Sequence, residues 1–339
     1  MSSANGTDFS KWKSQFFNAT DALKKRDKTQ YIVDQLLPLP SLTMFYGIAG
    51  SLKTNLVLDM AVCVATGQRW LTELPDNPKT GFDVIKQPVL WIDVDSGQRV
   101  LHNRIGAMLR IRKAKKDTPI TYASFLAPPF VATNTKATAY LVSVIKDLAA
   151  KFVVFDNLGT ISGNIDENSN QMVGVMSALR SIAEATDSAA AVIHHDTKHD
   201  NGNRKTPRGH SSIEAALDLA LCVKREDDVV NIYPTKMRNE PVESFSALWT
   251  WEPDAETRQL KEARFYGIEG NVDPGNAKAD DLIIKRLKKS SCTQGDMISF
   301  LQENKVGKGK CLSRLQTLEH KGKIRLKSGN AHNRKVYSL

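Results

Sequence analysis

A glycine-bearing segment near residue 50 holds the clearest chemistry in this 339-residue chain. Residues 42–46 form a short apolar run typical of a buried strand, and residues 55–66 have helical periodicity. Between them lies Gly47-Ile-Ala-Gly-Ser-Leu-Lys-Thr54, in the strand-loop-helix context of a loop that binds nucleotide phosphates. Backbone N–H groups would hold the phosphates, the Lys53 amine would reach the β and γ oxygens, and the Thr54 hydroxyl would bind Mg²⁺.

The loop departs from the usual pattern at one position. A phosphate loop normally has glycine immediately before its lysine, and here Leu52 stands there. A side chain at that position must point away from the phosphates, while Gly50 supplies flexibility two residues earlier. An ordinary turn between a strand and a helix is the alternative interpretation. The predicted nucleotide contacts are Gly47, Ala49, Gly50, Ser51, Leu52, Lys53 and Thr54.

A second metal ligand is expected on a neighbouring strand. The sequence Phe152-Val-Val-Phe-Asp156 has four apolar residues of a buried strand followed by a carboxylate, which would hold the Mg²⁺ together with Thr54. A carboxylate that caps a following helix is the alternative for Asp156. The predicted cofactors are therefore ATP and Mg²⁺.

Composition excludes several classes of protein. With 41% hydrophobic and 25% charged residues, the chain has the apolar content of a folded protein and not of a disordered one. No apolar run is long enough to span a bilayer and no basic-then-apolar signal opens the sequence, so we expect a cytoplasmic protein without a membrane partner. The four cysteines form no C-x-x-C pair, which argues against structural zinc and a disulfide framework.

The order of apolar segments predicts an α/β fold with a mainly parallel central sheet. Short apolar runs alternate with helical-period segments, the pattern of crossover units. The expected strands are 42–46, 89–93, 152–155 and 190–194, and the expected helices are 55–66, 98–111, 171–185 and 212–223. Two later strands, 229–234 and 246–252, have no helix between them, so that edge is expected to be antiparallel. The expected parts are an arm (1–40), an ATPase core (41–265), a linker (266–276) and a C-terminal domain (277–339).

The C-terminal domain holds all of the excess positive charge. Residues 275–339 contain 15 Lys and Arg against 5 Asp and Glu, whereas the rest of the chain is balanced. Helical periodicity in 279–289, 293–303 and 308–321, followed by two strand-like pieces, resembles a winged helix-turn-helix domain, which binds duplex DNA through its recognition helix and wing. Protein contacts are the alternative use of that fold. The candidate DNA contacts are Lys308, Lys310, Arg314, Lys323, Arg325 and Lys327.

Taken in order, the motifs resemble the RecA-like ATPase core of replicative hexameric DNA helicases, most of all the plasmid RepA-type helicases. The resemblance runs from residue 42 to about residue 241 and covers about 200 residues. Its motifs after the phosphate loop are Val89-Leu-Trp-Ile-Asp-Val-Asp95, Asp156, Val192-Ile-His-His-Asp-Thr-Lys198, Ser212-Ile-Glu-Ala-Ala-Leu-Asp218 and Thr235-Lys-Met-Arg238. Upstream, Tyr31-Ile-Val-Asp-Gln-Leu-Leu-Pro38 is similar to the segment that opens the RepA-type chains.

The resemblance implies roles for four further residues. Asp95 matches the glutamate that polarises the attacking water, with one methylene fewer, and His195 matches the γ-phosphate sensor. The alternative for His195 is a histidine at a strand end whose ring nitrogens hydrogen-bond to backbone groups. Lys236 and Arg238 match the pair that reaches a neighbouring subunit's γ-phosphate, which implies a homo-oligomer, with a hexamer expected. Two exposed basic residues at a strand end are the alternative for that pair.

The resemblance also implies contacts with single-stranded DNA. Residues 160–172 and 197–211 resemble the loops that grip the strand in the family's central channel, and the candidate phosphate contacts there are Lys198, Arg204, Lys205 and Arg208. The expected function is a ring-forming, ATP-dependent DNA motor of the replicative helicase type. The alternatives are a recombinase-like filament ATPase and a weakly hydrolysing regulator that acts through its winged helix.

Overall fold

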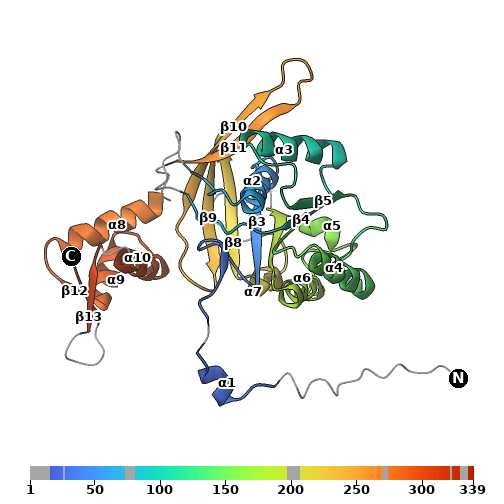
Figure 1. Ribbon diagram of the computed structural model, residues 1–339. Coiled ribbons are helices and arrows are strands. Elements are labelled where there is room, and N and C mark those ends of the chain that lie inside the picture. The colour runs from blue at the N-terminus through green and yellow to red at the C-terminus, as the bar shows by residue number, and fades with distance from the viewer. Residues whose placement is uncertain are drawn as a thin grey trace. The chain divides into compact units, whose positions relative to one another are not determined.

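The computed structural model describes residues 16–25, 27–72, 81–196, 207–268, 274–320, 323–328 and 335–339 (Figure 1). The chain divides into two compact units, residues 1–30 and residues 31–339. The described part of the first unit holds α1 (Ala19–Leu23), a short helix that Asn18 caps and whose side chains all remain unburied. The expected arm of residues 1–40 thus extends too far, because Ile32 and Leu37 already pack into the core of the second unit.

A large sheet forms the centre of the second unit. Its strands are β3 (Ser41–Gly47), β4 (Val89–Asp93), β5 (Ile120–Ser124), β6 (Phe152–Asp156), β7 (Ala189–His195), β8 (Leu219–Glu226), β9 (Val229–Met237), β10 (Phe245–Pro253) and β11 (Leu260–Ile268). Their order is β11-β10-β9-β8-β3-β7-β6-β4-β5. The strands from β8 to β5 in this order are parallel, and β9, β10 and β11 are antiparallel, as the sequence predicts for that edge.

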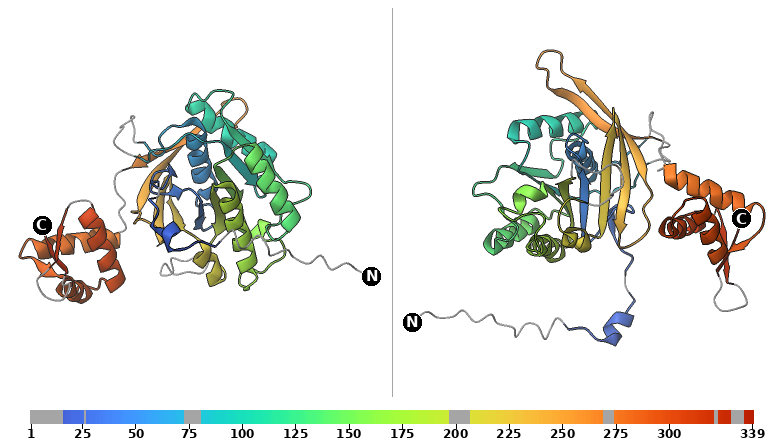
Figure 2. Two further views of the ribbon diagram at one scale, coloured as in Figure 1. Left: turned by 60° about the horizontal axis from the view of Figure 1, so that its bottom comes forward. Right: turned by 180° about the vertical axis from the view of Figure 1, so that it is seen from behind.

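Helices cover the two faces of this sheet (Figures 1 and 2). Strand residues alternate between the faces, so that Phe45 and Trp91 join one apolar cluster while Met44 and Ile92 join the other. The first cluster includes side chains of α2 (Lys53–Thr66) and α3 (Gln98–Ile111), and also of the small hairpin β1 (Tyr31–Val33) and β2 (Leu37–Pro38). The second includes side chains of α4 (Thr135–Asp147), α5 (Leu158–Ile161), α6 (Met172–Thr186) and α7 (Ser211–Ala216).

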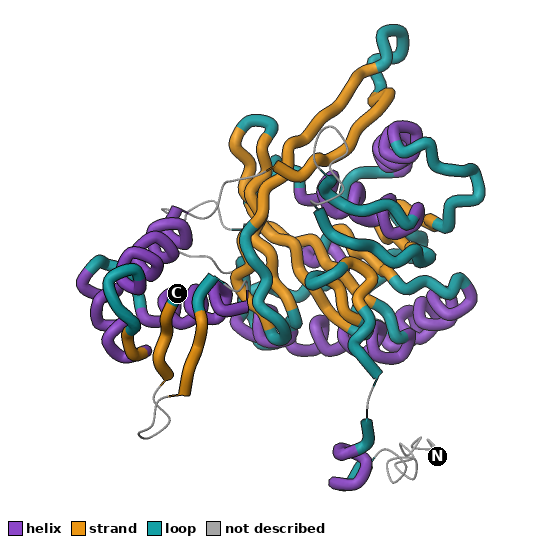
Figure 3. Tube along the Cα trace, turned by 60° about the vertical axis from the view of Figure 1, so that its left-hand side comes forward, coloured by secondary structure: helices purple, strands orange, loops and turns teal. Residues whose placement is uncertain are grey.

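The C-terminal module has a hydrophobic core of its own. It contains α8 (Pro274–Leu287), α9 (Gln294–Glu303) and α10 (Lys308–His320), followed by β13 (Arg325–Ser328) and β14 (Lys335–Ser338) (Figure 3). The Thr293 hydroxyl caps α9 as its position predicts, and a short strand that the sequence did not suggest, β12 (Cys292–Thr293), completes a sheet with the order β12-β14-β13. Of the expected linker, residues 269–273 lie outside the described residues, and α8 begins at Pro274.

One sequence prediction about the core is wrong. The helix expected over residues 212–223 ends at Ala216, and β8 begins at Leu219. The run from Leu219 to Val223 is buried at every position, because β8 lies inside the sheet between β3 and β9. Periodicity does not separate such a short, fully apolar strand from a buried helix.

None of the described helices combines the length and the apolar character needed to cross a membrane.

Candidate nucleotide-binding site

A cavity of about 280 Å³ lies at the carboxyl edge of the parallel strands. Parallel pairing places the ends of β3, β6 and β7 side by side, so residues that are distant in sequence meet there. The sequence-predicted residues that line the cavity are Ala49, Gly50, Leu52, Lys53, Thr54, Asp95, Asp156 and His195. The structure therefore assembles at one site the groups that the sequence suggested for phosphate, metal, water and γ-phosphate contacts.

The Lys53 amine lies inside the phosphate loop. It donates hydrogen bonds to the carbonyl oxygens of Gly47 at 2.9 Å and Ile48 at 2.8 Å, and Ser51 Oγ lies 3.3 Å away. Burial lowers the pKa of Lys53, and the negative charge of Asp156 opposes that shift. Gly47 and Ser51 do not line the cavity but hold the lysine beside it.

Gly47 is required by the approach of a neighbouring strand. A Cβ atom at this position would lie 2.2 Å from the carbonyl oxygen of Val223 on β8. No side chain fits that distance, so the end of β3 can turn into the phosphate loop here only without one.

Leu52 occupies a backbone conformation that favours glycine. Its φ is +64° and its ψ is 19°, in the left-handed region, immediately before α2 begins at Lys53. Its side chain is half-buried and packs against the apolar cluster that α2 shares with the sheet. The loop thus keeps the geometry that glycine normally provides, and the leucine offsets the strain of about 1–2 kcal/mol with apolar contacts.

Substitutions at Leu52 test this account. We expect Leu52→Gly to be more stable than Leu52→Ala by about 1 kcal/mol, because both lose the apolar contacts and only glycine loses the strain. Chemical denaturation of the two variants measures the difference. Where φ is negative, glycine is ordinarily less stabilising than alanine in or beside a helix. A Leu52→Ala variant as stable as Leu52→Gly, or more stable, would therefore contradict the strained conformation.

Asp156 and Thr54 form the part of the site that suits a divalent metal. Asp156 ends β6 with 1% of its surface exposed, and the Thr54 hydroxyl hydrogen-bonds to its carboxylate. Its second oxygen, Oδ2, has no hydrogen-bond partner among the described residues. Burial raises the pKa of Asp156 to about 7, and the Thr54 bond opposes that rise. A buried carboxylate with an orphaned oxygen beside a hydroxyl is an oxygen donor set that fits Mg²⁺.

The two carboxylates after β4 have different surroundings. Asp93 is buried and accepts hydrogen bonds from the backbone N–H groups of Ser96 and Gly97, both at 2.9 Å, and from the Ser124 hydroxyl at 2.6 Å. It therefore shapes the turn into α3. Asp95 is exposed and lines the cavity, the placement expected for a residue that contacts water at the γ-phosphate.

Four residues that line the cavity were missed by the sequence reasoning, namely Asn55, Ser96, Arg104 and Ile193. Arg104 on α3 lines it and donates a hydrogen bond to the Ser96 hydroxyl at 3.1 Å, and Ser96 lines it as well. Arginine is suited to contact phosphate oxygens, so this side chain adds a cation to the site. The sequence did offer a signal for Arg104: it is a basic residue two turns into the helix that follows a strand ending in carboxylates. The direction of α3 relative to the cavity, however, was not readable from the sequence.

Strand alternation separates the two adjacent histidines of β7. His195 lines the cavity, where burial and then the charge of Lys53 lower its pKa. His194 is buried on the opposite face, and its Nε2 lies 2.9 Å from the carbonyl oxygen of Arg208. Burial lowers the pKa of His194 as well. Both imidazoles are therefore favoured in the neutral form, and only His195 meets the nucleotide cavity.

Lys236 and Arg238 lie away from this cavity. Lys236 lies near the carboxyl end of the antiparallel β9, and Arg238 follows that strand. This end of β9 pairs with the beginning of β8, so both residues lie at the edge of the sheet opposite the phosphate loop. Lys236 donates to the carbonyl oxygens of Glu214 and Ala215 at the end of α7. Arg238 also donates to Ala215, at 2.9 Å, and pairs with Asp218 at 3.3 Å. Within one copy of the chain, this pair is anchored to α7.

The predicted DNA contacts fall into three groups. Lys198, Arg204 and Lys205 lie outside the described residues. Arg208 is half-exposed and pairs with Glu167 at 3.1 Å, a contact that joins the two loops expected to grip DNA. In the C-terminal module, the exposed or half-exposed candidates are Lys308, Lys310, Lys323, Arg325 and Lys327.

Arg314 corrects one expectation about the C-terminal module. Only 7% of its surface is exposed, and its guanidinium makes two bonds with Asp280, at 2.8 Å and 2.6 Å. This two-point pairing joins α10 to α8 and occupies the side chain inside the module. Arg314 is therefore a structural residue and not an exposed phosphate contact.

The sheet, the phosphate loop and the convergent cavity define the class as a RecA-like P-loop ATPase. The family described as "AAA domain" matches residues 10–201, more than half of the chain, and the chain belongs to this family. No curated protein matches the chain. Among solved structures, a KaiC-like protein from the hyperthermophilic archaeon Pyrococcus horikoshii OT3 is similar, with 14% identity and a TM-score of 0.45 over 71% of this chain and 99% of that one.

Proposed function

We propose that this ATPase is a ring-forming DNA motor of the RepA helicase type, which hydrolyses ATP with Mg²⁺ while it holds single-stranded DNA. The observation that carries the proposal is the division of the predicted catalytic groups. Lys53, Asp95, Asp156 and His195 share one cavity, whereas Arg238 lies at the opposite edge of the sheet. A site divided in this way is completed by a neighbouring copy of the chain.

The cavity residues have complementary tasks in hydrolysis. When ATP binds, the Lys53 amine gives up its hydrogen bonds to the loop carbonyls and bonds instead to the β and γ phosphate oxygens. Its positive charge then lies where negative charge develops during hydrolysis. Thr54 and Asp156 would hold Mg²⁺, and the ion supplies charge neutralisation on the phosphates. Asp95 accepts a hydrogen bond from the attacking water, and neutral His195 donates one to the γ-phosphate.

The proposed trans contact uses a preformed pair of cations. The last carbonyls of α7 fix Lys236 and Arg238 at the end of β9, so their direction is set before assembly. In a closed ring, this edge of one copy faces the phosphate loop of the next, and Arg238 stabilises the transition-state charge there. A hexamer is the ring size that we propose from the resemblance to replicative helicases.

The C-terminal module is proposed to be a winged helix-turn-helix domain that binds duplex DNA. Its three helices and small sheet have the required order, with α10 as the recognition helix and the β13–β14 hairpin as the wing. Lys308 on α10 and Arg325 and Lys327 on β13 are exposed and supply positive charge for backbone phosphates.

ATP hydrolysis with and without single-stranded DNA tests the motor. We expect the strand to stimulate hydrolysis at protein concentrations that favour assembly, and Lys53→Ala to lower the rate by about 100-fold or more because it removes the phosphate contact. The Lys113→Ala variant changes an exposed lysine outside the cavity and serves as the matched control. A rate that neither the strand nor Lys53→Ala changes would contradict the proposal.

Two further outcomes separate the alternatives. Electron microscopy of the assembly with ATP and DNA distinguishes the closed ring that we propose from the open filament of a recombinase-like ATPase. Nucleotide binding without turnover, together with tight binding of duplex DNA, would instead support a regulator that acts through the C-terminal module.

A further inference from the structure

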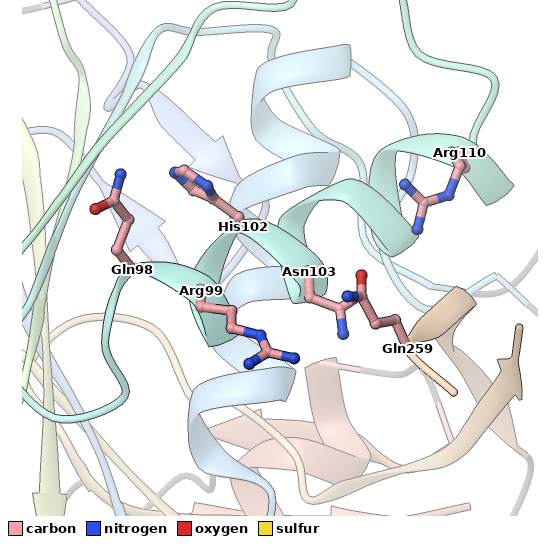
Figure 4. A pocket seen from close by; sticks show the side chains of 6 residues that line it. All are labelled: Gln98, Arg99, His102, Asn103, Arg110 and Gln259. Carbon is pink, nitrogen blue, oxygen red and sulfur yellow. The ribbon is translucent and has the colours of Figure 1, made fainter. Parts of the chain in front are cut away.

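A second hollow, of about 410 Å³, lies on the outer side of α3 beside the turn between β10 and β11 (Figure 4). The described residues that line it are Gln98, Arg99, His102, Asn103, Arg110 and Gln259. Three of these are basic or can become so, three are amides, and none is a carboxylate. The hollow is separate from the nucleotide cavity, which α3 borders through Arg104 instead.

A glycine in the middle of α3 shapes this hollow. Residues 99, 103, 106 and 110 recur at helical spacing on one face of α3, and position 106 is Gly106. The Arg110 guanidinium lies back over that glycine, where a Cβ atom would be 2.9 Å from its Nη1. Glycine inside a helix costs about 1 kcal/mol relative to alanine, and the position of Arg110 supplies a physical reason for it here.

Arg110 is a fixed cation at one end of the hollow. Its Nε donates to the carbonyl oxygen of Lys261 at 2.7 Å, and its Nη2 donates to that of Leu260 at 2.8 Å. These partners are neutral carbonyls, so the positive charge is held in place without being neutralised by them. Figure 4 shows Arg99 and Asn103 projecting from α3 toward Gln259 of the hairpin, while Gln98 and His102 project from the other side of the ribbon in this view.

The surroundings of the hollow carry charges of both signs. Residues 96–116 contain seven Lys and Arg and no Asp or Glu, but Arg112 is buried against Asp59 and Arg104 lines the nucleotide cavity. The adjoining hairpin carries the carboxylates of Glu252, Asp254, Glu256 and Glu262, of which Glu252 is paired with Lys261 at 3.0 Å. The His102 ring packs edge-on against Tyr122, with the centroids 5.3 Å apart and the planes at 81°, which orients the imidazole at the hollow.

We propose that this hollow binds the phosphate of a phosphate ester, with Arg99, His102 and Arg110 around the anion. The amides of Gln98, Asn103 and Gln259 then hydrogen-bond to the sugar or base, because amide groups offer both donors and acceptors. Two sources present this chemistry: the backbone of a nucleic-acid strand and a free nucleotide. The site is independent of the phosphate loop and does not rest on the proposed motor function.

Binding measurements on the full chain test the site. The probes are a fluorescein-labelled single-stranded oligonucleotide, followed by anisotropy, and radiolabelled ADP, followed by equilibrium dialysis. The test variant is Arg99→Glu, and the matched control is Lys116→Glu, which makes the same charge change at an exposed residue outside the hollow. A second test variant, Gly106→Ala, displaces Arg110 without changing the net charge.

If the ligand is a strand, both test variants weaken oligonucleotide binding about fivefold or more beyond the control, and Arg99→Glu lowers the salt slope by about 1. If the ligand is a free nucleotide, the number of ADP molecules bound per chain falls by one in both test variants while oligonucleotide binding matches the control. ATP hydrolysis without DNA stays at the control rate in either case, which separates this site from the phosphate loop. Test variants that match the control with both probes would overturn the proposal.

Discussion

Arg112→Met is expected to lower the free energy of unfolding by about 3–5 kcal/mol. Arg112 follows α3, and its Nη2 lies 2.6 Å from Asp59 Oδ1 on α2, with both side chains almost completely buried. The same carboxylate oxygen accepts a hydrogen bond from the Phe265 backbone N–H of β11. Removal of the guanidinium leaves the buried Asp59 carboxylate without its cation. The carboxylate must then either remain charged and unpaired or take up a proton.

Urea denaturation checks this expectation, with Arg99→Met as a control that removes an exposed arginine from the same helix. Burial raises the pKa of Asp59 and the Arg112 charge opposes that rise, so the single variant is also expected to be less destabilised at low pH, where Asp59 is protonated. The double variant Asp59→Leu, Arg112→Met removes both charges and should recover most of the loss. A loss of less than about 1 kcal/mol for Arg112→Met would show that the pair does not join α2 to α3 in the way described.

Asp156→Asn is expected to slow ATP hydrolysis strongly and to stabilise the fold. The amide is a poor Mg²⁺ ligand, so the rate should fall about 100-fold or more. The ionised carboxylate is unfavourable in its buried position, and the neutral amide has nearly the same shape. We therefore expect Asp156→Asn to raise the free energy of unfolding by about 2 kcal/mol at pH 8 in the absence of nucleotide.

The pH dependence of this gain follows from the pKa of Asp156. Burial raises that pKa from 3.8 to about 7, so between these values the folded state binds a proton that the unfolded state has released. The Asp156 contribution to wild-type stability therefore falls as pH rises from about 4 to 7. The advantage of Asp156→Asn should be largest above pH 7 and disappear near pH 4, as measured by denaturation at several pH values beside Asp95→Asn, which alters an exposed carboxylate. An advantage that does not change with pH would contradict the assigned shift.

The local elements of the core were largely readable from the sequence. The strand at 89–93 and the helix at 98–111 have the predicted bounds, and the helix after the phosphate loop begins only two residues before its predicted start. In contrast, β5, α4 and β11 were not predicted. β5 is a half-exposed edge strand, without the continuous apolar run that marks the buried parallel strands.

The sequence by itself determined the loop that holds Lys53 and Thr54, because strand, loop and helix are consecutive and their chemistry is set by nearest neighbours. Only the tertiary structure decided which distant residues meet. It placed Arg104 at the cavity, and it brought Arg110 to the carbonyl of Leu260, 150 residues away in the chain. It also buried Arg314 against Asp280, since burial depends on which helix faces cover one another. Such contacts form across packed elements, and neither residue type nor spacing records them.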